Sequence, residues 1–177
     1  MKKLIATLLA LTLALTLGTV AMAEETAPTF MKGVQFNMDM DQVMQMIDLP
    51  NPEIENERDN FAVPFAELEY EHVSDYDFTA DLSFKFVGNC LVAIHIDLAE
   101  GTSYEAVKAE LVKTYGETVP FDAAKVGNGR YAIDDDGDLK DCKEMIEAKG
   151  VTIVLEQDHD GDVDVTFLDP TAAYINN

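Results

Sequence analysis

Residues 81–116 read DLSFKFVGNCLVAIHIDLAEGTSYEAVKAELVKTYG, and this stretch decides the fold. Apolar residues occupy every second position on either side of Gly88-Asn89: Leu82, Phe84 and Phe86, then Val92, Ile94, Ile96 and Leu98. Such alternation predicts two strands that present one apolar face. After Gly101 the apolar period becomes helical up to Gly116, and the spacing of Thr102 and Glu105 predicts a capping box at the start of this helix. We therefore expect a hairpin and a helix that bury each other.

The flanking sequence predicts further elements of both kinds. Asp39 and Gln42 form a capping box for a helix over 38–49, and Pro50 ends it. The proline-rich stretch 50–64 is typical of a long loop, and alternation predicts a strand over 67–73. Residues 138–149 carry apolar residues at helical spacing and end at Gly150, which predicts a third helix. Two strands joined by a turn at Asp160-Gly161 follow.

Together these elements predict an α+β fold, with two or three helices packed on one face of an antiparallel sheet. The segments 39–47 and 103–111 align with matching apolar positions, which indicates two degenerate repeats. We expect one domain over 33–170, preceded by a flexible lead-in (24–32) and followed by a tail (171–177).

The amino-terminal residues are typical of an export signal. Lys2-Lys3 precedes an uncharged apolar run, and Ala21-Met22-Ala23 is the small-x-small pattern of a signal peptidase site. We therefore expect residues 1–23 to be a signal peptide and the protein to be secreted or periplasmic. The alternative is an uncleaved anchor, for which the run is short.

The composition is strongly acidic. The chain has 34 acidic and 12 basic residues among 177, a formal charge of −22. Such a surface repels phosphate backbones and anionic lipids, so nucleic acid and membrane binding are disfavoured. Cationic proteins or peptides and divalent cations are the favoured partners. Solubility alone is the competing explanation of this charge.

Cys90 and Cys142 are the two cysteines. In an exported protein they can form one disulfide, and the alternative is a pair of buried free thiols. The sequence leaves both possibilities open.

Acidic residues also suggest a calcium site. Asp158, Asp160 and Asp162 surround a glycine, as in calcium-binding loops, because Ca²⁺ prefers six to eight oxygen ligands. Residue 167, at loop position twelve, is Phe instead of the usual Glu. A hairpin turn with acidic outer residues is the alternative. We expect no resident cofactor, with calcium as the possible exception, and the soft thioethers of Met38, Met40, Met44 and Met46 suggest Cu(I) as a more distant alternative.

Catalytic motifs are not evident in the sequence. None of the three histidines has a Ser or Cys at a recognisable family spacing. His95 alternates with Ile94 and Ile96 and shares its side of the strand with Asp97, so it is a candidate base or ligand. A hydrolase of unrecognised type is therefore the most distant of our hypotheses.

Several residues around the two helices match a family pattern. Gly33, Phe36, Met38 and Val43 fit an opening Gly-x-x-aromatic segment, and Leu49-Pro50 and Tyr115-Gly116 match the helix endings. In this the chain resembles exported β-lactamase-inhibitor-protein-like domains and small outer-membrane lipoproteins of the SmpA/OmlA type. Asn37 replaces a glycine of the pattern, Asp39 replaces Ser or Thr, and the lipidated cysteine is missing. The resemblance implies a non-enzymatic exported domain whose sheet face binds another protein.

The leading hypothesis from sequence is thus a secreted, acidic interaction module. A divalent-cation-binding domain is the second hypothesis. The predicted binding surface is the outer side of the sheet, with Glu67, Glu69, Glu71, Lys85, His95 and Asp97.

Overall fold

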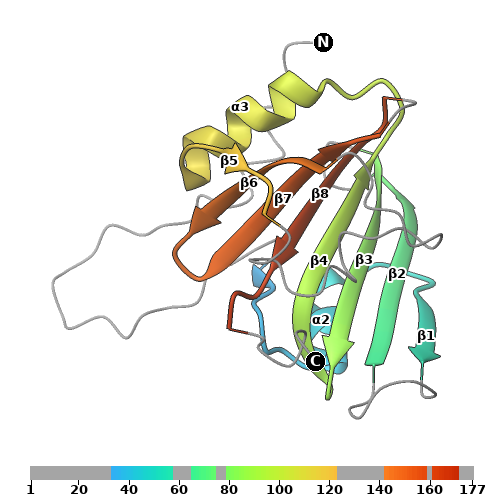
Figure 1. Cartoon of the computed structure of the whole chain (residues 1–177). Helices are drawn as coiled ribbons and strands as arrows, with labels where there is room; N and C mark the ends of the chain where they lie inside the picture. The colour runs from blue at the N-terminus through green and yellow to red at the C-terminus, as the bar shows by residue number, and fades with distance from the viewer. Residues whose placement is uncertain (1–32, 58–64, 75–78, 123–141, 159–160, 172–177) are drawn as a thin grey trace, which may run out of the picture.

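Eight strands form one antiparallel sheet in the computed structural model, which describes residues 33–57, 65–74, 79–122, 142–158 and 161–171 (Figure 1). The strands are β1 (Glu53–Glu57), β2 (Phe65–Val73), β3 (Ala80–Val87), β4 (Cys90–Leu98), β5 (Val119–Pro120), β6 (Cys142–Ala148), β7 (Val151–Gln157) and β8 (Val163–Leu168). Two helices accompany them, α2 (Met40–Ile47) and α3 (Tyr104–Tyr115). The predicted signal peptide and lead-in lie outside the described residues.

The strand order is β1-β2-β3-β4-β8-β7-β6-β5. Among the described residues, each half of the chain supplies one helix and then four strands, and the halves meet where β4 pairs with β8. The segments 39–47 and 103–111, which align in sequence, contain α2 and the first part of α3. Consequently β1 and β5, the first strands of the two halves, form the two edges of the sheet.

Both helices pack on the same face of the sheet. Val43 and Ile47 of α2 and Val107 and Leu111 of α3 belong to the main core. The register places buried apolar residues of six neighbouring strands in one row beneath them: Leu68, Phe84, Ile94, Phe167, Ile153 and Ile146. This continuous apolar row explains why the long sheet and the two helices of the described part share one main core.

The helix termini were predicted with mixed success. The capping box at α2 is confirmed, since the Gln42 amide donates to Asp39 Oδ1 at 2.8 Å and the Asp39 amide donates to Gln42 Oε1 at 2.9 Å. The capping box at α3 is wrong. Ser103 is the N-cap, and the Thr102 hydroxyl instead donates to the Ala99 carbonyl at 2.6 Å.

The predicted fold class is also wrong, because the described residues form mainly a β-sheet with two short helices of 8 and 12 residues. The described part of the third predicted helix is strand β6, which pairs with β7 from Cys142 to Ala148. Gly150, with φ +77°, lies in the two-residue connection of this hairpin and not at a helix end. Strand pairing therefore overrides the helical spacing of the apolar residues.

Two further differences concern strand positions. Residues 53–57, predicted as loop, form edge strand β1. The β3–β4 register shifts between Lys85 and Phe86, so that Phe86 pairs with Leu91. Leu91 therefore joins the main core, while Val92 packs in a smaller cluster on the other face. Alternation in the sequence does not show where a bulge occurs. The residue inserted by a bulge reverses, from that point on, which side chains face the core.

Candidate functional site

The face of the sheet opposite the helices, called the polar face below, carries most of the predicted site residues. Directly opposed residues of antiparallel strands share a face. One row on this face runs Glu53, Glu69, Ser83, His95, Thr166, and the next runs Glu55, Glu67, Lys85, Ala93, Leu168. The register thus brings residues from distant parts of the sequence into two adjacent rows.

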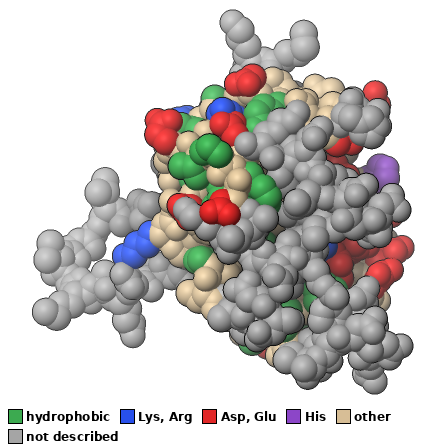
Figure 2. All heavy atoms as spheres, in the orientation of Figure 1, with side chains coloured by type: hydrophobic (Ala, Val, Ile, Leu, Met, Phe, Trp, Pro, Cys, Tyr) green, Lys and Arg blue, Asp and Glu red, His purple; other side chains and the backbone are tan. Residues whose placement is uncertain are grey.

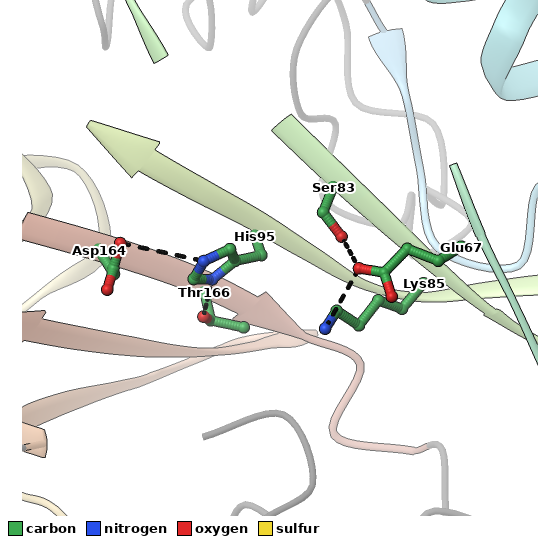
Figure 3. Close-up of polar contacts among 6 residues, drawn as sticks. All are labelled: Glu67, Ser83, Lys85, His95, Asp164 and Thr166. Atoms are coloured by element: carbon green, nitrogen blue, oxygen red, sulfur yellow. Dashed lines mark hydrogen bonds and ion pairs between the residues drawn. The ribbon is translucent and has the colours of Figure 1, made fainter. Parts of the chain in front are cut away.

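Glu67 is the centre of the first polar cluster (Figure 3). Lys85 Nζ lies 3.3 Å from its Oε1, and the Ser83 hydroxyl donates a hydrogen bond to the same oxygen. The side chains of Glu67 and Lys85 are 15% and 23% exposed. This ion pair is half-buried, so solvent screens it less than a surface pair.

Acidic groups outnumber basic ones around this cluster. Strands β1 and β2 carry six glutamates and no lysine or arginine, and Lys85 is the single lysine of β3. The pKa of Glu69 is raised, mainly because burial desolvates its carboxylate and secondarily because Glu67, Glu55 and Glu53 are nearby. Lys85 opposes this shift. The region therefore has an excess of negative charge that a cation would relieve.

His95 forms a second polar cluster two strands away (Figure 3). Its Nδ1 lies 2.9 Å from the Thr166 hydroxyl oxygen, and its Nε2 lies 3.9 Å from Asp164 Oδ1. The prediction that His95 points away from the main core is confirmed by its place opposite Ser83 and Thr166. Its carboxylate neighbour is Asp164 of β8, which sequence spacing alone did not indicate.

The six predicted surface residues do not form one contiguous patch. Glu67, Glu69 and Lys85 lie together, whereas His95 belongs to the second cluster. Asp97 is exposed and lies opposite Asp81 and Asp164. Glu71 lies at the far end of β2, beside a register shift between Tyr70 and Val73. The predicted surface is therefore divided between two clusters, the exposed Asp97 and the end of β2.

A hollow of about 430 Å³ opens at this end of β2. The segment after α2 and the end of β2 line it, including Asn51, Glu53, Glu71 and His72. His72 has φ +52°, its amide donates to Asp81 Oδ1 at 2.5 Å, and its side chain is 82% exposed. Bulges of this kind redirect side chains, so both Glu71 and His72 face solvent.

Strand β1 forms an open, acidic edge, which we call the β1 edge and define by Glu53, Ile54 and Glu55. All three residues are exposed, and Ile54 is 47% exposed. Figure 2 shows acidic side chains gathered along this margin of the molecule. The β1 edge was not predicted, because it lies in the stretch interpreted as a loop. The alternation in Glu53-Ile54-Glu55 was the available signal.

The opposite edge differs in length and chemistry. Strand β5 has two residues, Val119 and Pro120. Proline lacks an amide hydrogen, and short edge strands resist pairing with another chain. Of the two edges, only the β1 edge offers a longer run of backbone groups.

Of the two possibilities that the sequence left open for the cysteines, the structure has no disulfide at Cys90, which is a free cysteine. The pairing pattern explains this. Cys90 lies at the start of β4, opposite Val87, whereas Cys142 lies opposite Glu156 at the far end of the sheet, three strands away. Three strand spacings alone amount to about 14 Å, beyond the ~7 Å that a disulfide spans between Cα atoms.

The predicted calcium loop is a hairpin connection between β7 and β8 in its described part. Asp158 Oδ1 accepts hydrogen bonds from the amides of Gly161 at 2.8 Å and Asp162 at 3.0 Å. Asp160 lies outside the described residues. Among the residues that are described, no three His, Cys, Asp or Glu side chains are grouped so that they could hold a metal ion. The hairpin interpretation accounts for Asp158, and calcium binding stays a prediction.

A third polar cluster joins α3 to β6. Glu144 accepts hydrogen bonds from Tyr104 at 3.0 Å and Thr118 at 2.8 Å, and Lys108 Nζ lies 2.5 Å away. The hydrogen bond from Lys108 is the main cause of the lowered pKa of Glu144, while burial and Glu144 raise the pKa of Tyr104. These residues attach the helix to the sheet.

Within the described ranges, neither helix has both the length and the apolar character needed to cross a membrane. No family model matches the sequence, and comparisons with curated proteins and with solved structures found no match.

Proposed function

We propose that this protein is an exported, non-enzymatic interaction module that binds a cationic protein segment on the acidic side of its sheet formed by β1 and β2. The observation that carries the proposal is the six glutamates on these strands, with Lys85 as the neighbouring cation. The raised pKa of Glu69 supports it, because that shift reflects unrelieved repulsion among carboxylates as well as desolvation.

The polar clusters also favour binding over catalysis. Glu67 already contacts Ser83 and Lys85, and His95 contacts Thr166, so both clusters join neighbouring strands. In contrast, exposed carboxylates lie at Glu53, Glu55 and Glu71. A partner can contact these three without breaking the hydrogen bonds and the ion pair of the two clusters. A cationic partner would be attracted over a long range and released at high salt.

A charge-reversal experiment tests this function. The double variant Glu53→Lys/Glu55→Lys should bind a ten-residue polylysine probe at least about tenfold more weakly than the wild type at low salt. Folding should survive, because the new lysines would lie opposite Glu69 and Glu67.

The matched control is Glu100→Lys/Glu117→Lys, which alters the net charge equally at exposed positions outside β1 and β2. This control should keep most of the affinity for polylysine. Equal losses in the two variants would mean that only the overall charge matters, and the proposed site would be wrong.

A further inference from the structure

The β1 edge has two properties that bear on partner binding. As the end strand of the sheet it leaves one row of backbone amides and carbonyls without a neighbouring strand in the described part of the chain. Its side chains alternate acidic, apolar, acidic, and all three are exposed. An exposed edge is a template for another extended chain, and its side chains select which chain can pair.

The register defines what a ninth strand would meet. A residue opposite Ile54 would extend the apolar row that continues through Leu68 and Phe84. Residues opposite Glu53 and Glu55 would extend the two polar rows that continue through Glu69 and Glu67. Directly opposed side chains lie about 5 Å apart at Cβ, so each position contacts its new neighbour.

Charge decides between the possible occupants. A second copy of this chain pairing antiparallel about Ile54 would place Glu53 opposite Glu55, and like charges in that position are destabilising. A segment with lysine or arginine at those positions would gain two opposite-charge pairs and place its central apolar side chain against Ile54.

We propose that the β1 edge binds an extended segment of a cationic partner protein by strand addition, with a basic-apolar-basic pattern matching Glu53, Ile54 and Glu55. The inference rests on the proposed function and specifies the partner class. Backbone hydrogen bonds provide affinity, and the alternating side chains provide specificity. The short, proline-containing β5 edge does not offer this mode.

The test compares two peptides of identical composition and charge. Thr-Lys-Val-Lys-Val-Lys-Thr places all lysines on one side of a strand, whereas Thr-Lys-Lys-Val-Val-Lys-Thr divides them between both sides. Affinities are measured with the purified full chain by fluorescence anisotropy. Hydrogen exchange at the amides of β1 is followed with each peptide.

Strand addition predicts that the alternating peptide binds about tenfold more tightly than its permuted form. It also predicts slower exchange of β1 amides in that complex. Equal binding of the two peptides, without protection of β1, would overturn strand addition and leave the acidic binding surface intact. If neither the peptides nor polylysine bind, the proposed function fails as well.

Discussion

Lys85 of β3 lies opposite Glu67 of β2, with its Nζ 3.3 Å from Glu67 Oε1, and both side chains are half-buried. This ion pair joins β2, which carries three glutamates, to β3. It places one positive charge beside Glu67 and Glu69, whose carboxylates otherwise repel each other and those of β1. The same carboxylates therefore affect both the stability of the fold and the proposed binding of a cationic partner.

Removing this lysine should destabilise the protein. We expect Lys85→Met to lower the free energy of unfolding by about 1–3 kcal/mol at neutral pH, between the values typical of exposed and buried ion pairs. Urea denaturation measures the change. The double variant Glu67→Gln/Lys85→Met should recover much of the loss, because it no longer leaves Glu67 charged and half-buried. Equal stability of Lys85→Met and the wild type would contradict this account.

Glu69 should make stability depend on pH. Its pKa is higher in the folded than in the unfolded state, so the folded state binds the proton more tightly. Its favourable contribution is therefore complete below the unfolded pKa and is lost as pH rises through the folded pKa. Glu69→Gln should raise the melting temperature at pH 7 and leave it almost unchanged near pH 3. A gain of the same size at both pH values would point to a cause other than ionisation.

Glu144 should show the opposite pH dependence. Its pKa is lowered chiefly by the hydrogen bond from Lys108, so its contribution is present above the unfolded pKa and is lost as pH falls through the folded pKa.

Tyr104→Phe should lower the free energy of unfolding by about 0.5–1.5 kcal/mol, since it removes one hydrogen bond to Glu144. Hydrogen exchange should show the loss mainly in α3. Uniform loosening of β2 and β3 instead would refute the anchoring role.

Asp158 provides a test of the hairpin against the calcium hypothesis. Asp158→Ala removes the acceptor of two turn amides and should cost about 1–2 kcal/mol, whereas Asp158→Asn keeps an oxygen acceptor and should cost less. The hairpin interpretation predicts the same melting temperature in EDTA and in millimolar Ca²⁺. A rise with Ca²⁺ that Asp158→Asn abolishes would favour a calcium site.

The cysteines should remain thiols in the folded protein. Cys90 is free, and the sheet holds it three strands from Cys142. We expect two thiols per chain when denatured protein, purified without reductant, is titrated with a thiol reagent. The melting temperature should not change with reductant. Finding no titratable thiol in monomeric protein would require a different strand order.

Elements that depend on neighbouring residues were predictable from the sequence. The capping box of Asp39 and Gln42 joins residues three positions apart, so the start of α2 follows from local chemistry. The alternation of Leu82, Phe84 and Phe86 likewise identifies the buried side of β3. Both signals involve residues within one helical turn or one strand, so they do not depend on a distant partner.

The tertiary structure decided where distant residues pair. Residues 53–57 form a strand because they pair with β2, although the proline content of this stretch favoured a loop. Residues 142–148 form a strand because they pair with β7, although their apolar spacing favoured a helix. The pairing of β4 with β3 moved Val92 to the polar face, and the pairing of β4 with β8 brought Asp164 and Thr166 to His95.

The amino-acid sequence by itself therefore determined the acidic charge and the local start of α2. Only the fold decided that Glu53, Ile54 and Glu55 form an open edge. Strand pairing depends on contacts between residues far apart in the chain, which local periodicity does not encode.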